Sequence, residues 1–199
     1  MQPSYAATPR PPGTVVQASR LLLFVAVLGL VDAVAAVTAV LQLTRRVDAF
    51  RAVAGNDFDG RVAEVLNGSV VAATVSGCAL LAMSALAVLV RRPKPWARVA
   101  AWVSSALLTL VLVCTVAGNP NLFAEPLQHV SAEIQAGWDA LLPDWYAPVH
   151  YVCEAGMLVA SVVVGVLLAQ TSAHEFYELS RSVSEDDPRL WDIKRLGGS

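Results

Sequence analysis

Four long apolar segments dominate this chain and restrict what it can fold into. They cover residues 20–43, 66–90, 99–117 and 147–170. Each has about the 20 mainly apolar residues that a helix needs to cross a hydrocarbon core of ~30 Å. The apolar runs are continuous rather than alternating, which disfavours a transmembrane β-barrel. We therefore expect an all-α, polytopic membrane protein with a bundle of four transmembrane helices.

The composition agrees with a lipid environment. Hydrophobic residues make up 56% of the chain and charged residues 15%, which differs from an ordinary soluble domain. The formal net charge of −2 gives no general attraction for nucleic acid, so the lipid bilayer is the expected partner. Arginine greatly outnumbers lysine in an Ala- and Val-rich chain. This bias is typical of high-GC bacterial genes and suggests a bacterial inner membrane.

The distribution of basic residues predicts the orientation. The short loop after the second segment contains Arg91, Arg92, Lys94 and Arg98, and short loops rich in Lys and Arg stay in the cytoplasm. Residues 99–180 contain neither Lys nor Arg, so the loop 118–146 is expected outside. Both termini are then cytoplasmic. Arginines in the loop 44–65 oppose this orientation, but the loop before Val99 is shorter and more densely basic.

The first segment has an alternative interpretation as a signal peptide. Arg20, the apolar run 21–31 and the small residues Ala33 and Ala35 resemble a charged flank, an apolar core and a cleavage site. The apolar run continues to Leu43, however, which favours a retained transmembrane helix.

The chain is expected to have three parts. Residues 1–19 are rich in proline and predict a disordered cytoplasmic tail. Residues 20–170 form the bundle, with outer loops 44–65 and 118–146. Residues 171–199 form a cytoplasmic C-terminal tail, which is expected to be helical to about Arg181. Small residues recur every four positions in two segments and predict close helix packing there: Ser69, Ala73 and Gly77, and Ser161, Gly165 and Ala169.

Both outer loops carry helical patterns. Val47, Phe50 and Val53 continue an apolar stripe beyond the first segment, so the first helix is expected to run to Ala54 and to form a helical hairpin outside the membrane. In the second loop, an amphipathic helix is predicted between Pro126 and Pro143. Its apolar stripe is Leu127, Val130, Ile134, Trp138 and Leu141. This helix either lies in the membrane interface or packs on the hairpin, as a connector or as a docking surface.

Asp32 is the candidate intramembrane polar site. It lies near the middle of the first segment, where a carboxylate costs ~2.5–3.5 kcal/mol on insertion scales and should face the bundle. The functional interpretation is a proton or cation site. The structural interpretation is a hydrogen bond to a neighbouring hydroxyl, because no Lys or Arg is available within the segments. The candidate hydroxyls are those of Thr74, Ser76, Ser104 and Thr109.

His150 and Glu154 form a second, weaker candidate site. Their i, i+4 spacing places them on one face of the fourth segment, near its outer end. A pair of this kind suits either a divalent metal or a His–Glu hydrogen bond, and two ligands alone do not make a metal site. The chain has no Gly-rich phosphate loop, G-x-S-x-G or H-E-x-x-H motif. We therefore predict no catalytic, cofactor-binding or metal-binding residues.

These features leave three classes of function. The favoured expectation is a non-enzymatic accessory or scaffold subunit of a bacterial inner-membrane assembly, with a protein partner or self-association. The alternative is a small oligomeric channel or transporter that uses Asp32 as an intramembrane proton or cation site. The third is a membrane enzyme with a site near His150 and Glu154.

Overall fold

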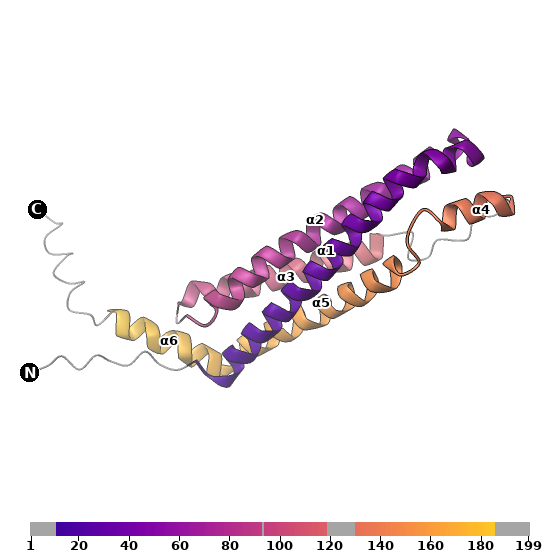
Figure 1. The fold of residues 1–199 in the computed structure, drawn as a ribbon. Helices are drawn as coiled ribbons and strands as arrows, with labels where there is room; N and C mark the ends of the chain where they lie inside the picture. Colours follow the sequence, from indigo (N-terminus) through magenta and orange to yellow (C-terminus); the bar gives the residue numbers. More distant parts are fainter. Residues whose placement is uncertain (1–10, 93, 119–129, 186–199) are drawn as a thin grey trace, which may run out of the picture.

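The computed structural model describes residues 11–92, 94–118 and 130–185, and these are almost entirely helical, with no strand among them (Figure 1). The elements in order are α1 (Gly13–Ala54), the 3-10 turn η1 (Asn56–Phe58), α2 (Asp59–Leu89), α3 (Pro95–Gly118), α4 (Ala132–Asp139), α5 (Tyr146–Ala169) and α6 (Thr171–Glu185). The all-α prediction is confirmed at this level.

Four of these helices, α1, α2, α3 and α5, are long and apolar enough to cross a membrane. They contain the four segments expected from the sequence except Val90 and Gln170, which each follow the last residue of a helix. Their outward surfaces carry large apolar side chains, such as Leu81, which is 73% exposed, and Val152, which is 69% exposed. Apolar patches of this extent are unusual on water-soluble monomers. The chain therefore has the character of a multi-pass membrane protein.

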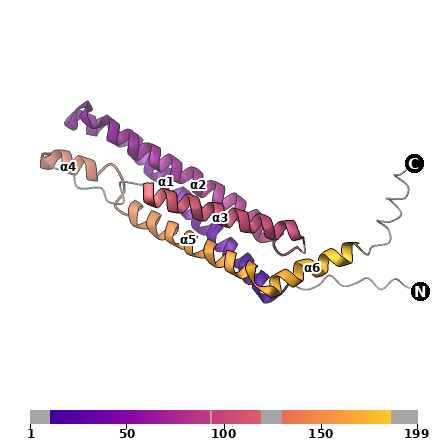
Figure 2. The ribbon, with the colours of Figure 1, turned by 180° about the vertical axis from the view of Figure 1, so that it is seen from behind.

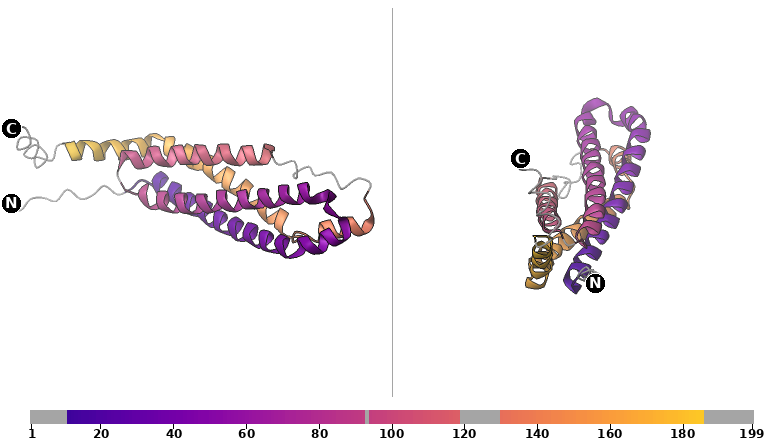
Figure 3. Two further views of the ribbon diagram at one scale, coloured as in Figure 1. Left: turned by 90° about the horizontal axis from the view of Figure 1, so that it is seen from above. Right: turned by 90° about the vertical axis from the view of Figure 1, so that its left-hand side faces the viewer.

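Helix α1 lies at the centre of the arrangement. It packs most extensively against α2 and then against α5, while α3 packs mainly against α5. Figure 2 shows α3 and α5 side by side, with α1 and α2 behind them. The helix α6 continues beyond α5 at one end of the molecule and α4 lies at the other (Figure 3). We refer to these as the α6 end and the α4 end.

The start of α1 differs from the prediction for the N-terminal tail. The tail was expected to be disordered to residue 19, but helix α1 begins at Gly13, directly after Pro12. Residues 1–10 lie outside the described part. Val15 and Ala18 are fully buried in the same apolar cluster as Phe176 and Tyr177 of α6. The prediction is wrong for residues 13–19 because contacts with a distant helix stabilise this stretch.

The other end of α1 is as expected. The helix ends at Ala54, and Gly55 follows with a φ of 72°, a left-handed conformation that glycine adopts without steric cost. Phe50 near this end is buried and packs with Val62 of α2 and Leu141. Beyond the apolar segments, the two helices therefore continue as one packed hairpin.

Helix α4 is shorter than the predicted amphipathic helix. It covers Ala132–Asp139, and Ser131 caps it by accepting a hydrogen bond from the Ile134 N–H at 3.3 Å. Leu127 and the other residues of 119–129 lie outside the described part of the chain. The Trp138 ring packs on the Phe50 ring of α1, with 5.8 Å between the centroids. In the structure, α4 thus lies on the hairpin.

Helices α1 and α2 approach each other closely at Gly29. A Cβ atom added to Gly29 would lie 2.9 Å from the Ser76 backbone oxygen, so only glycine fits there. The small-residue stripes were expected to mark such sites, but a Cβ added to Gly77 or to Gly165 would meet nothing within 4 Å. The tight crossing lies one helical turn from Asp32 and brings the two backbones together beside it.

The C-terminal helix α6 begins after a break at Gln170, whose ψ of 148° is extended. Helix α6 runs to Glu185, slightly beyond the expected end near Arg181. Tyr177 fixes its first half, because its hydroxyl donates to the Val90 carbonyl oxygen at 2.6 Å. This contact joins α6 to the end of α2.

Candidate intramembrane polar site

Asp32 is fully buried, with 0% of its surface exposed. Its two carboxylate oxygens have partners from two other helices. The Ser76 hydroxyl of α2 donates to Oδ2 at 2.5 Å, and the Nδ1 atom of His150 on α5 lies 2.8 Å from Oδ1. Asp32 therefore ties α1 to both of its neighbours, and the predicted hydroxyl partner Ser76 is present.

His150 lies between two carboxyl groups. While Nδ1 contacts Asp32, Nε2 lies 3.6 Å from the Glu154 Oε1 atom, an ion-pair distance rather than a hydrogen bond. The imidazole is nearly parallel to the Tyr146 ring, with centroids 5.7 Å apart and an interplanar angle of 14°. Stacking and hydrogen bonding together fix the orientation of the His150 ring.

Glu154 connects the cluster to a fourth helix. Its Oε1 atom lies 3.3 Å from the Thr115 hydroxyl of α3, which also lies 2.8 Å from the Leu112 carbonyl oxygen. A hydroxyl has a single proton to donate. The Thr115 hydroxyl can therefore donate either to the Leu112 carbonyl oxygen or to the Glu154 carboxyl group.

Charge counting indicates how many protons the cluster holds at the lowest cost. A group of buried charges is least costly in a low-dielectric region when its total charge is zero. For Asp32, His150 and Glu154 together, zero charge requires two protons, for example on His150 and Glu154. Because the three groups interact, a shared proton belongs to the cluster rather than to one residue. The chemistry that this arrangement can perform is the binding and release of a proton.

The surroundings of the cluster are closely packed. The other titratable side chains near it are Tyr146, Tyr151 and Cys153, all on α5. The cavities beside Arg98, beside Gln42 and beside Ser105 are lined by other residues than Asp32, His150 and Glu154. Within the same residues, no group of three or more His, Cys, Asp or Glu side chains has a geometry that would hold a metal ion.

Sequence reasoning treated Asp32 and the His150–Glu154 pair as separate candidates, and the structure joins them. A signal for this was present. Apart from cysteine and tyrosine, His150 and Glu154 are the only ionisable residues in the segments 66–90, 99–117 and 147–170. Among these residues, only His150 can carry the positive charge that would pair with an intramembrane carboxylate. His150 lies near the beginning of the segment 147–170, whereas Asp32 lies near the middle of the segment 20–43. This difference in position conceals the pairing of the two residues.

Comparison of the chain with family models, with curated proteins and with solved structures finds no match in any of the three.

Proposed function

We propose that the protein is a non-enzymatic, proton-responsive interaction subunit of a bacterial inner-membrane assembly. The observation that carries this proposal is the buried His150 ring between the carboxyl groups of Asp32 and Glu154. In this proposal the termini are cytoplasmic, as the basic loop 91–98 indicates. The α4 end, with the hairpin tip and α4, then lies outside the membrane and offers a surface to a partner.

The proton would act by changing the packing of four helices. With two protons the cluster is neutral, and its contacts hold α1, α2, α3 and α5 together. Loss of one proton leaves a net negative charge in a region of low dielectric, which weakens these contacts. The helices that carry the hairpin and α4 would shift accordingly. Proton occupancy is thereby coupled to the surface presented to a partner.

The position of Asp32 supports an interaction role better than an oligomeric pore. A pore on the axis of an oligomer is lined by side chains that point away from their own bundle. Asp32 instead points between α1, α2 and α5 of the same chain, and it is fully buried there. Its partners are side chains of this chain.

The proton-binding part of the proposal is tested by unfolding at different pH values. The full chain in mild detergent is compared with Asp32→Asn, His150→Gln and Glu154→Gln. We expect the wild-type unfolding midpoint to vary with pH and this variation to shrink in each variant. Ser105→Ala is the matched control, because this buried hydroxyl of α3 lies outside the cluster and has no hydrogen-bond partner among the described residues. A pH profile common to all the variants would exclude the proposal.

The interaction part is tested by purification in mild detergent, with the molar mass determined by light scattering. We expect a stoichiometric companion or a self-associated species, and its abundance should change with pH in the wild type but not in His150→Gln. A monomer that migrates alone at every pH contradicts this part of the proposal.

A second candidate function is proton or cation transport, which the position of an ionisable cluster inside an apolar bundle favours. Its test is flux into liposomes that contain the purified protein and an internal pH-sensitive dye. Flux that Asp32→Asn abolishes would establish transport in place of the interaction role. Wild-type liposomes no leakier than protein-free ones would exclude it.

A further inference from the structure

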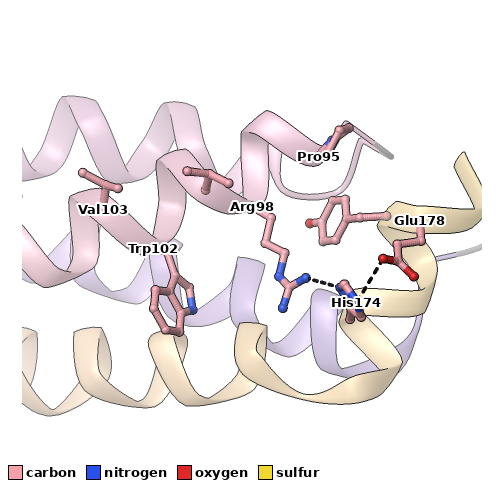
Figure 4. Close-up of a pocket in the computed structure, with 8 residues that line it drawn as sticks. Pro95, Arg98, Trp102, Val103, His174 and Glu178 are labelled. Atoms are coloured by element: carbon pink, nitrogen blue, oxygen red, sulfur yellow. Dashed lines mark hydrogen bonds and ion pairs between the residues drawn. The ribbon is translucent and has the colours of Figure 1, made fainter. Parts of the chain in front are cut away.

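A cavity of ≈ 370 Å³ lies at the α6 end, between the beginning of α3 and α6. Figure 4 shows Arg98 and Trp102 from α3 on one side and His174 and Glu178 from α6 on the other. None of these residues belongs to the Asp32 cluster. The cavity therefore requires an explanation of its own.

Arg98 places an unpaired positive charge in this cavity. Its Nε donates to the Leu168 carbonyl oxygen at 3.0 Å, and its Nη1 lies 2.8 Å from the His174 Nδ1 atom. Neither acceptor is a carboxylate, and Arg98 forms no ion pair with any residue in the described ranges. A guanidinium has five N–H donors. Three donors and the full charge thus remain for another ligand.

The hydrogen bonds of His174 define its protonation state. Arginine is always a donor, so His174 Nδ1 accepts from Arg98 and the ring proton resides on Nε2. This Nε2 donates to the Glu178 Oε1 atom at 3.0 Å. The imidazole is therefore neutral, and it separates the Glu178 carboxylate from Arg98. The side chain of Glu178 is 65% exposed, so water screens its charge.

The other part of the cavity is apolar. Val99 and Val103 line it and are about 60% exposed, at 61% and 60%. Trp102 lies between them in sequence, and its indole Nε1 donates to the Gly165 carbonyl oxygen at 3.0 Å, which fixes the ring. These residues belong to a helix apolar enough to span a membrane. From Arg98 to Val103, about one and a half turns of α3 or ~7.5 Å, the lining changes from charged to apolar.

We propose that this cavity binds an anionic phospholipid. The phosphate group would accept hydrogen bonds from the free N–H groups of Arg98, a pairing that guanidinium geometry favours. The upper part of an acyl chain would lie along Val99, Trp102 and Val103. Charge complementarity and the change from polar to apolar lining both fit an amphiphile, whereas a free phosphate would use only the charged half. The site goes beyond the proton-responsive role and does not depend on it.

The experiment uses the full-length protein in liposomes that contain phosphatidylglycerol or phosphatidylcholine with brominated acyl chains. Bromine quenches tryptophan fluorescence on contact. The chain has five tryptophans, so the difference in quenching between the wild type and Trp102→Phe reports the lipid at Trp102. We expect brominated phosphatidylglycerol to quench severalfold more effectively than brominated phosphatidylcholine at equal content. Equal quenching by the two lipids in the wild type would overturn the proposal.

Variants assign this preference to the cavity. Arg98→Gln should abolish the preference for phosphatidylglycerol, and Trp102→Phe should remove the quenching that reports it. The control Arg92→Gln removes a neighbouring exposed charge that does not line the cavity, and it should retain the preference. A loss in Arg92→Gln equal to that in Arg98→Gln would reduce the effect to general surface charge and refute the site.

Two further measurements keep the test decisive if Arg98→Gln does not fold. Glu178→Gln changes an exposed side chain and removes the acidic group of the cavity, so it should strengthen the preference for phosphatidylglycerol. A weaker preference would contradict the proposal.

Inorganic phosphate in large excess should leave the quenching unchanged, since the acyl chain contributes to binding. Relief of quenching by phosphate would identify a soluble anion as the ligand instead.

Discussion

At the scale of single residues, three buried polar side chains of this protein contact one another and form a cluster rather than separate hydrogen bonds. Asp32, His150 and Glu154 come from two helices, and each of them also contacts a further side chain or ring. Removal of one member leaves its partners buried without a hydrogen bond, which costs about 1–3 kcal/mol. The members should therefore be energetically coupled.

A double-mutant cycle tests this coupling. Asp32→Ala and His150→Ala should each lower the free energy of unfolding by about 1–3 kcal/mol, because each leaves a buried partner unsatisfied. The double variant should lower the free energy of unfolding by less than the sum of the two single variants. Each single variant already removes the interaction between the two residues, so the sum counts it twice. Reversible unfolding in detergent provides the measurement. Strictly additive effects would show that the two residues act independently.

A second residue-scale prediction concerns Tyr177 of α6. Burial raises the pKa of its phenol to about 12, from an ordinary value of 10.0. A raised pKa means that folding favours the protonated phenol. Its contribution to stability is complete below pH ~10 and is lost as the pH rises through 12. The wild type should therefore lose stability between pH 10 and 12 more steeply than Tyr177→Phe, as measured by the unfolding midpoint. Parallel pH profiles would contradict this assignment.

At the scale of the helices, the contact between α1 and α2 depends on Gly29. A side chain there would meet the backbone of α2 rather than a movable side chain. The same crossing brings the Ser76 hydroxyl to Asp32. The polar cluster is thus positioned by a close approach of two backbones.

Gly29→Ala should separate α1 from α2 and destabilise the bundle by about 1–3 kcal/mol, the usual cost of an overpacked contact. Gly77→Ala is the matched control on α2, because the added methyl group meets nothing within 4 Å. It should be neutral or slightly stabilising, since alanine favours a helix more than glycine does. Thermal unfolding of both variants decides between these outcomes. Equal effects would mean that the crossing at Gly29 is not tight.

The sequence predicted the elements better than their contacts. Continuous apolar runs locate helices in lipid because every backbone polar group there must be satisfied internally. The end of α1 at Ala54 was predictable because glycine follows it. The beginning of α1 was not, because Val15 is buried by α6, a helix distant in sequence. The pairing of Asp32 with His150 likewise depends on how α1 and α5 cross, and periodicity carries no information about crossings.

At the scale of the whole molecule, the proposed orientation places the two ends of the bundle on opposite sides of the membrane. The α6 end contains the basic loop 91–98 and the cavity around Arg98. The α4 end contains the hairpin tip at Asn56–Phe58. The polar cluster lies between them. Orientation therefore decides which compartment each surface meets.

Cysteine labelling tests this orientation. In a background with Cys78, Cys114 and Cys153 replaced by alanine, Asn56→Cys should react with a membrane-impermeant maleimide in intact cells. Arg92→Cys should react only after the cells are permeabilised, because the basic loop 91–98 is expected in the cytoplasm. The reverse pattern would invert the topology, and with it the compartment that the hairpin tip faces.

The length of α1 has a mechanical consequence. Its 42 residues make a rod of ~63 Å, and Asp32 lies close to the midpoint of Gly13–Ala54. A rod held at its centre tilts about that point, so its two ends move in opposite directions. A tilt of about 10° would move each tip by about 5 Å in opposite directions. A small rearrangement around the Asp32 carboxylate would thus move the surfaces at the α4 end and at the α6 end together, through the rotation of a single helix.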